Sequence, residues 1–186
     1  MHRLTAKEKD MRKLSFIITL IVCLSVTALA QTGSTASKPN GEFGYGYVFF
    51  GPGGYNSGGG EATMQVGGGG EAVFKNGAGI GAELAYLTRF KDTGDGIGMF
   101  SINGSYHFLK ASKDRKVVPF LTGGYTGFMK GDYVNGINVG GGVNYWFKPR
   151  VGLRFEFRNS VWLEDSVWAF ADGMNFWNVR IGLTFR

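Results

Sequence analysis

From residue 41 to the end of the chain, apolar and polar side chains alternate along segments of roughly ten residues, which turn-forming residues separate. Such alternation places successive side chains on opposite faces of a β-strand. The clearest segments begin at Val151 (VGLRFEFR) and Trp177 (WNVRIGLTFR), and each has one entirely apolar face. Nothing here has a helical period. The pattern predicts eight strands, at about 41–50, 62–74, 78–90, 97–108, 117–129, 137–147, 151–158 and 177–186.

The two faces of these segments differ in composition. One is mainly apolar, whereas the other holds mostly Gly, Ser and Asn with a few charges of both signs. A soluble sandwich would instead expose faces rich in Lys, Glu and Thr. Small residues suit the interior of a narrow barrel, and apolar faces bordered by aromatic belts suit lipid. The aromatic residues expected to crown the lipid-facing surface are Tyr45, Tyr47, Tyr145, Trp146 and Trp177.

The sequence therefore predicts an all-β protein, an eight-stranded antiparallel up-and-down transmembrane β-barrel over 41–186. The length of these segments agrees with this prediction, because a tilted membrane strand needs only about 9 to 11 residues. The 117–129 segment is irregular: Phe120 and Phe128 break the alternation of Leu121 and Tyr125 with threonines, which leaves its faces undecided.

Composition narrows the class of protein further. All 32 glycines among the 186 residues fall at or after Gly33, and 15% of the chain is aromatic. Glycine costs roughly 1 kcal/mol relative to alanine inside a helix, so the composition argues against a helix bundle. The absence of a Gly-X-Y period excludes collagen, and the many aromatic residues argue against a disordered chain.

Residues 1–30 have the features of an export signal. Arg12 and Lys13 precede an apolar run, which closes with Ala28-Leu29-Ala30, a small-x-small cleavage pattern. Cleavage there would remove the one cysteine, Cys23, and leave 31–40 as a flexible leader rich in Ser, Thr and Gly. Residues 1–30 hold five of the 20 basic and two of the 14 acidic residues, so the mature chain has a net charge of +3. This modest charge shows no nucleic-acid footprint.

The strand pattern also fixes the order of the connections. Lys75-Asn76-Gly77 carries the Asn-Gly hairpin signal, and Lys148-Pro149-Arg150 forms a second tight turn. If the first strand starts in the periplasm, the periplasmic links are 75–77, 109–116 and 148–150. The outward links are then 51–60, 91–96, 130–136 and 159–175.

Charged residues on the inward phases are the main candidate site. They are Glu83, Arg154, Glu156, Arg158 and Arg180. Opposite charges in a narrow lumen would pair, fixing strand register and filling space as a plug. The functional alternative is an ion gate.

Three other features are weaker candidates for chemistry. Ser105 and His107 share a face, as a nucleophile and base would, but alternation produces this spacing often and places both inward. Asp92 and Asp95 could bind calcium, although two carboxylates are too few to favour it. Gly-x-Gly clusters such as 77–81 precede no helix, so no dinucleotide site is expected. We expect no cofactor, no metal and no catalytic residue.

The 159–175 connection is the longest outward link. It carries aromatic and acidic residues on a long loop. Such residues suit either a ligand-binding rim or a loop that lies against the membrane. These residues are Trp162, Glu164, Asp165, Trp168, Phe170 and Asp172.

The export signal, the eight strands, and the stretches GINVGGGVNYWF from Gly136 and KPRVGLRFEFRN from Lys148 resemble the small bacterial outer-membrane β-barrel family, which includes opacity-protein-like and OmpA-type barrels. The resemblance covers about 41–186. It implies that the last strand carries the signal read by the outer-membrane barrel assembly machinery, with Phe185 as its aromatic residue. Family members usually end on that aromatic, whereas Arg186 follows it here.

The leading functional hypothesis is a monomeric, integral outer-membrane protein that acts as a structural or surface-interaction protein with a largely closed lumen. Its partners would be outer-membrane lipid and an unidentified surface ligand. A narrow channel for ions or small apolar solutes is the alternative. It ranks second because eight strands leave little interior space. A membrane-embedded lipid hydrolase ranks third, and we expect that the protein is not an enzyme.

Overall fold

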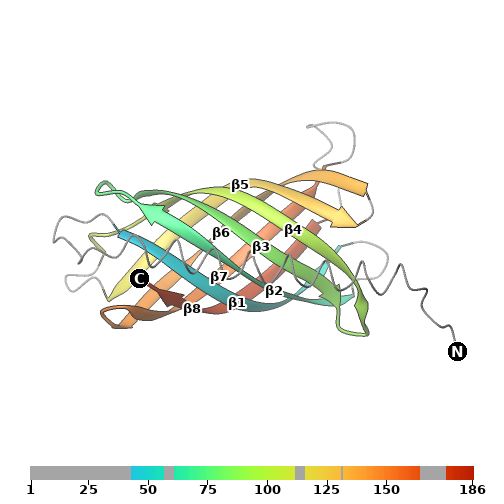
Figure 1. Ribbon diagram of the computed structural model, residues 1–186, viewed down its shortest axis with the longest axis horizontal. Coiled ribbons are helices and arrows are strands. Elements are labelled where there is room, and N and C mark those ends of the chain that lie inside the picture. Colours follow the sequence, from blue (N-terminus) through green and yellow to red (C-terminus); the bar gives the residue numbers. More distant parts are fainter. Residues whose placement is uncertain (1–42, 57–60, 112–115, 131, 164–174) are drawn as a thin grey trace, which may run out of the picture.

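Eight strands form one closed antiparallel barrel (Figure 1), in which each strand pairs with its neighbours in sequence and β1 closes the ring on β8. The computed structural model describes residues 43–56, 61–111, 116–130, 132–163 and 175–186. Within this part of the chain no helix is long and apolar enough to cross a membrane. The predicted fold class is confirmed. The strands are β1 (Phe43–Tyr55), β2 (Ala62–Val73), β3 (Ala78–Arg89), β4 (Asp92–His107), β5 (Val117–Lys130), β6 (Asp132–Lys148), β7 (Val151–Trp162) and β8 (Asn175–Phe185).

The two ends of the barrel differ in their connections. One end, here called the turn end, holds the β2–β3, β4–β5 and β6–β7 connections together with Phe43 and Arg186. At the β2–β3 turn, Gly77 has φ +89°, and the backbone N–H of Ala78 donates to Asn76 Oδ1 at 3.0 Å. The Asn-Gly signal is thus confirmed, because glycine tolerates this left-handed conformation. The other end, the loop end, holds the remaining four connections.

Strands at the loop end extend further than the sequence pattern indicated. The expected links at 91–96 and 130–136 are wrong, because β4 begins at Asp92 and β6 at Asp132. Arg89 pairs with Asp92 across one hairpin, and Lys130 pairs with Asp132 across the other. Gly and Asp favour turns in isolation, but here the partner strand supplies backbone hydrogen bonds up to the bend. Likewise β1 extends to Tyr55 and β7 to Trp162.

The alternation separates an apolar outer wall from a polar interior in most strands. In β8, Trp177, Val179 and Ile181 are exposed on the outer face, whereas Asn178 and Arg180 are buried inside. The same order holds in β7, where Phe155 and Phe157 are exposed. These phases agree with the sequence prediction.

The expected orientation of β1 is wrong. Tyr45, Tyr47 and Phe49 lie inside the barrel with 5% exposure or less, and Val48 and Phe50 face outward. Both faces of this strand lack charged residues, so its alternation alone cannot show which side is inward. The interior is favoured because the two tyrosine hydroxyls find carboxylate partners there, as buried tyrosines usually require.

Trp146 was also expected on the lipid-facing surface, and it lies in the lumen with 3% exposure. Its ring contacts Tyr45 edge-on, with 5.9 Å between the ring centroids. Tyr145 and Trp177 do face outward. In β5, Phe120 and Phe128 point inward in phase with Thr122 and Thr126, which are also buried. The undecided strand therefore alternates regularly, with aromatic residues on its inner face.

Glycines on the inner face of β2 make room for the β1 aromatic rings. An added Cβ at Gly69 would lie 2.9 Å from Cζ of Tyr47, and one at Gly67 would lie 2.8 Å from Cζ of Phe49. Both glycines pair directly with these residues in the β1–β2 register. Large side chains on one strand thus occupy the space that glycine leaves on the next.

We expect Gly69→Ala to destabilise the barrel by about 1 to 3 kcal/mol, since its methyl group would crowd the Tyr47 ring and the Ala82 carbonyl oxygen at 2.6 Å. The free energy of unfolding in detergent measures this. Gly104→Ala is the matched control, because its nearest contact, Gly123 O, is 3.9 Å away. An equal loss in both variants would contradict the packing argument.

Candidate functional site: the filled lumen

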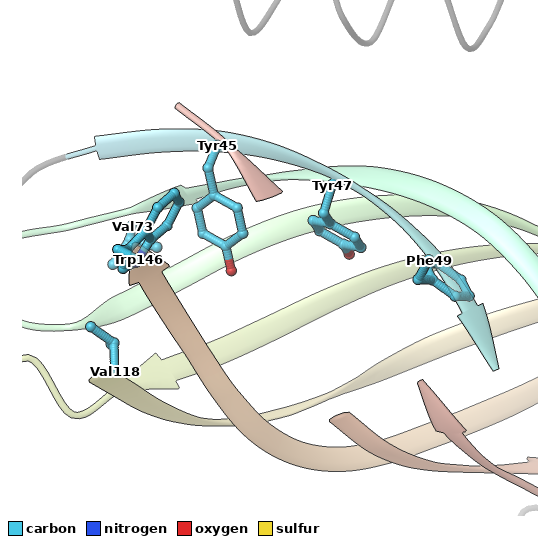
Figure 2. Close-up of a cluster of buried hydrophobic side chains, with 6 residues drawn as sticks. All are labelled: Tyr45, Tyr47, Phe49, Val73, Val118 and Trp146. Carbon is cyan, nitrogen blue, oxygen red and sulfur yellow. The ribbon is translucent and has the colours of Figure 1, made fainter. Parts of the chain in front are cut away.

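Apolar side chains fill both ends of the barrel interior. The first apolar cluster follows the inner face of β1 from the turn end (Figure 2). The second lies toward the loop end and is joined by Trp162, which stacks on Phe128 with ring centroids 5.7 Å apart. Trp162, expected on an outward loop, therefore ends β7 at the mouth of the lumen. The fully buried members are Tyr45, Tyr47, Phe49, Val73, Val118 and Trp146 in the first cluster, and Leu87, Met99, Phe128 and Phe176 in the second.

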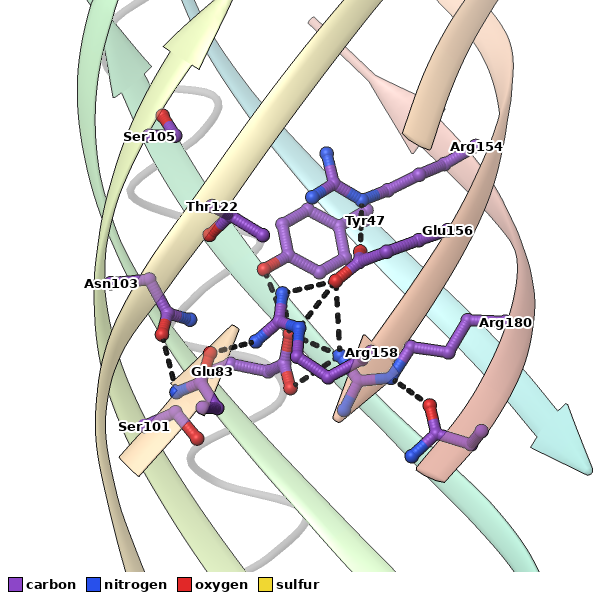
Figure 3. A network of polar contacts seen from close by, with 12 residues as sticks. Tyr47, Glu83, Ser101, Asn103, Ser105, Thr122, Arg154, Glu156, Arg158 and Arg180 are labelled. Carbon is purple, nitrogen blue, oxygen red and sulfur yellow. Dashed lines mark hydrogen bonds and ion pairs between the residues drawn. The ribbon is translucent and has the colours of Figure 1, made fainter. Parts of the chain in front are cut away.

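A network of charged side chains fills the lumen beside the β1 rings of the first cluster (Figure 3). On one side, the Arg154 guanidinium carbon lies 3.8 Å from the centroid of the Phe120 ring and 4.7 Å from that of Tyr47. On the other side, Gln65 accepts from Arg180 Nη2 at 2.6 Å and donates to Met99 Sδ at 2.9 Å. The Arg180 guanidinium carbon also lies 4.3 Å from the centroid of the Phe49 ring, so the rings of β1 line the charged network along its length.

Three arginines alternate through this network with three glutamates, namely Glu83, Glu156 and Glu71 of β2. Glu156 accepts from Arg154 Nε at 2.8 Å and from Arg158, while its Oε1 lies 3.7 Å from Arg180 Nη1. Glu83 accepts from Arg180 Nη1 at 2.9 Å, and its Oε2 lies 3.9 Å from Arg158 Nη2. The formal charges of these groups cancel, which matters because an unpaired charge in a desolvated site is very unfavourable.

The structure brings all five sequence-predicted charges together, and it adds a sixth. Glu71 of β2 lies 3.8 Å from Arg154 through its Oε2 atom and accepts a hydrogen bond from Tyr45 at 2.5 Å. The residues predicted from the sequence did not include Glu71. The position of Glu71 on the inner face of its strand could have indicated this role. The sequence pattern, however, contains no information about its distance across the lumen to Arg154 of β7.

Neutral side chains extend the network through further hydrogen bonds. Tyr47 donates to Glu83 at 3.0 Å, and Asn138 accepts from Arg158 at 3.0 Å. Asn138 in turn donates to Asn103 at 2.8 Å, so the network reaches β4. Asn138 also donates to Thr126 of β5 at 2.8 Å, so charge and hydrogen-bond pairing together connect all eight strands across the lumen.

Ser105 and His107 lie inside the barrel beside Glu71, but they are not arranged as a catalytic pair. His107 Nε2 lies 2.6 Å from Glu71 Oε1, and Ser105 donates to the same oxygen. His107 Nδ1 has no hydrogen-bond partner in the described part of the chain. A triad needs the histidine between serine and acid. Here the acid lies between the other two, and the serine proton points to a carboxylate.

The other sequence candidates are placed as follows. Asp92 and Asp95 belong to β4 rather than to a loop, and their side chains lie outside the described set. Among the described residues, no group of three His, Cys, Asp or Glu side chains could hold a metal ion. Phe185 faces outward at the end of β8. The signal and leader at 1–40 and the loop residues Glu164, Asp165, Trp168, Phe170 and Asp172 lie outside the described residues.

Comparison with solved structures identifies the fold. Neisserial surface protein A matches with a TM-score of 0.59 and 16% identity, over 76% of this chain and 96% of that chain. The protein has the fold of the small outer-membrane β-barrels. Ail, the attachment invasion locus protein of Yersinia pestis, matches with a TM-score of 0.52 and 12% identity, over 78% of this chain and 98% of that one.

A third match is an enzyme, whereas the first two are named as surface and attachment proteins. The outer membrane enzyme PagL has a TM-score of 0.50 and 15% identity, over 73% of this chain and 97% of PagL. The fold therefore accommodates both surface proteins and an enzyme, and the chemistry must be argued from the lumen and the surface. No family model matches the sequence, and no curated protein matches it either.

Proposed function

We propose that the protein is integral to the bacterial outer membrane and acts there as a structural or surface-interaction protein whose lumen is closed. The filled interior is the observation that carries this proposal: a balanced charge network and two apolar clusters occupy the lumen. The apolar outer wall supports a lipid environment, because large apolar residues cover it from β1 to β8. Similar structures named as surface and attachment proteins support the surface role.

A conduit and an enzyme are less well supported. A conduit would need water to replace arginine–glutamate pairs that are almost fully buried. An enzyme would need an activated nucleophile, whereas Ser105 donates to Glu71 and not to His107. The proposal includes a monomeric state, a signal peptide at residues 1–30 and a leader at residues 31–40.

The first test is electrical. Purified protein in a planar bilayer is expected to give near-zero ion conductance, because each guanidinium in the lumen already has carboxylate or amide partners. Folding must be verified in the same preparation by circular dichroism. Large, steady conductance from the folded protein would favour the channel instead.

A second test concerns assembly in the cell. We propose that Phe185 is the aromatic residue read by the barrel assembly machinery, which fits its outward position at the end of β8. Phe185→Ala should lower the amount of protein in outer-membrane fractions several-fold while leaving the purified, refolded barrel stable. The matched control is Phe147→Ala, which removes an equally exposed phenylalanine near the same end. Equal effects of the two variants would rule out a special role for Phe185.

A further inference from the structure

The turn end of the barrel carries an unbalanced set of cationic side chains. In the described residues 74–78, 108–111, 116–118, 147–151 and 185–186 there is no Asp or Glu. The same stretches hold six exposed cations, which we call the cationic collar: Lys75, Lys110, Lys116, Lys148, Arg150 and Arg186. They occupy the β2–β3, β4–β5 and β6–β7 connections and the end of β8, and so surround the barrel.

Charges at the loop end are mixed. Arg89 lies 3.5 Å from Glu61 there, and both side chains are about 40% exposed. The strands and links of this end also carry two more basic residues, Lys91 and Lys130, and three more acidic ones, Asp92, Asp95 and Asp132. The excess of positive charge is therefore confined to the turn end among the described residues.

Five of the six collar residues lie within two positions of a residue of the apolar wall. Phe74 precedes Lys75, Phe147 precedes Lys148, and Val117 follows Lys116, and these three neighbours are exposed on the outer surface. Phe185 directly precedes Arg186, and Phe108 lies two residues before Lys110; both phenylalanines are exposed. Cationic side chains at the edge of an apolar wall lie where lipid phosphates meet the hydrocarbon layer.

Arg186 has an additional contact. Its guanidinium carbon lies 4.3 Å from the centroid of the Trp146 ring, and its Nε donates to Pro149 O at 2.7 Å. It therefore covers the first apolar cluster as well as contributing charge. The exposed Lys110, Lys116, Lys148 and Arg150 carry the following proposal.

We propose that the cationic collar binds the phosphate headgroups of anionic phospholipids and enriches them around the turn end of the barrel. The inference rests on the membrane location proposed above. Cations spread around a circumference and bordered by apolar residues fit many independent headgroups, each with its acyl chain on the wall. One compact ligand or one polymer strand across the mouth would instead be matched by cations on a single side.

The proposal is tested in lipid nanodiscs of phosphatidylcholine with a minor fraction of phosphatidylglycerol. Spin-labelled forms of the two lipids report which is immobilised at the protein surface. We expect several-fold preference for phosphatidylglycerol at low salt, reduced at about 1 M salt, where the Debye length is about 3 Å. The variant with Lys110→Gln, Lys116→Gln, Lys148→Gln and Arg150→Gln should lose most of this preference.

Single substitutions provide the matched control. Lys148→Gln and Lys91→Gln each remove one exposed lysine, at the turn end and the loop end respectively. Only Lys148→Gln should lower the preference. Equal immobilisation of both lipids by the unmodified protein, or an equal effect of the two single variants, would overturn the proposal.

Two further outcomes are distinguishable. Failure of the protein to insert into nanodiscs of phosphatidylcholine alone would refute the membrane location itself rather than the lipid preference. Co-sedimentation with purified murein sacculi that the fourfold variant loses, with no lipid preference, would identify an anionic glycan as the partner and overturn the lipid proposal.

Discussion

Replacing Glu156 with alanine is expected to lower the unfolding temperature in detergent by roughly 10 °C, which corresponds to about 3 to 5 kcal/mol for breaking a buried ion pair. Glu156 is the carboxylate shared by Arg154, Arg158 and Arg180, so its removal leaves three guanidiniums with one fewer counter-charge. Water should enter to solvate them. The near-zero conductance of the unmodified protein is therefore expected to rise in the variant.

The matched control is Glu61→Ala. Glu61 also pairs with an arginine, but both side chains are about 40% exposed, and such pairs contribute only about 0 to 1 kcal/mol. Thermal unfolding and planar-bilayer recordings of the two variants separate the effects of a buried and an exposed charge. A Glu156→Ala protein as stable and as silent as the unmodified one would make the plug hypothesis untenable.

Replacing Ile181 with arginine is expected to prevent insertion into lipid vesicles, because a cationic residue on the lipid-facing midplane costs about 2 to 4 kcal/mol. Ile181 lies at the middle of β8 and is 52% exposed on the outer wall. Its pairing partners Phe50 and Phe155 are also exposed. An arginine there would have only apolar neighbours in these pairs.

Val117→Arg makes the same kind of change at a different depth. Val117 is on the outer wall too, but it begins β5 at the turn end beside Lys116. A charge close to the interface costs only about 0 to 1 kcal/mol, so this variant should insert nearly normally. The folded fraction is read from circular dichroism and from the electrophoretic mobility of unheated samples. Equal insertion of the two variants would contradict the proposed lipid-facing wall.

The sequence predicted the candidate site in part. Arg154, Glu156 and Arg158 alternate with apolar residues in one strand, so a period of two sufficed to place all three on the same face. The period of two could not predict which residues of other strands these three side chains contact. Glu83 and Arg180 are 97 residues apart, and only closure of the barrel brings them to 2.9 Å. Glu71 was missed for the same reason.

By itself, the sequence determined the strand class, the number of strands and the inner face wherever one face was polar, because alternation of side chains is a local property of an extended backbone. Only the tertiary structure decided the orientation of β1, the inward position of Phe120 and Phe128, and the extent of the loop-end hairpins. In β1 both faces lack charge, and the choice depends on glycines in β2 and on carboxylates reached across the lumen. Those contacts exist only after strand register and barrel closure have brought distant residues together, and alternation within one strand contains no information about either.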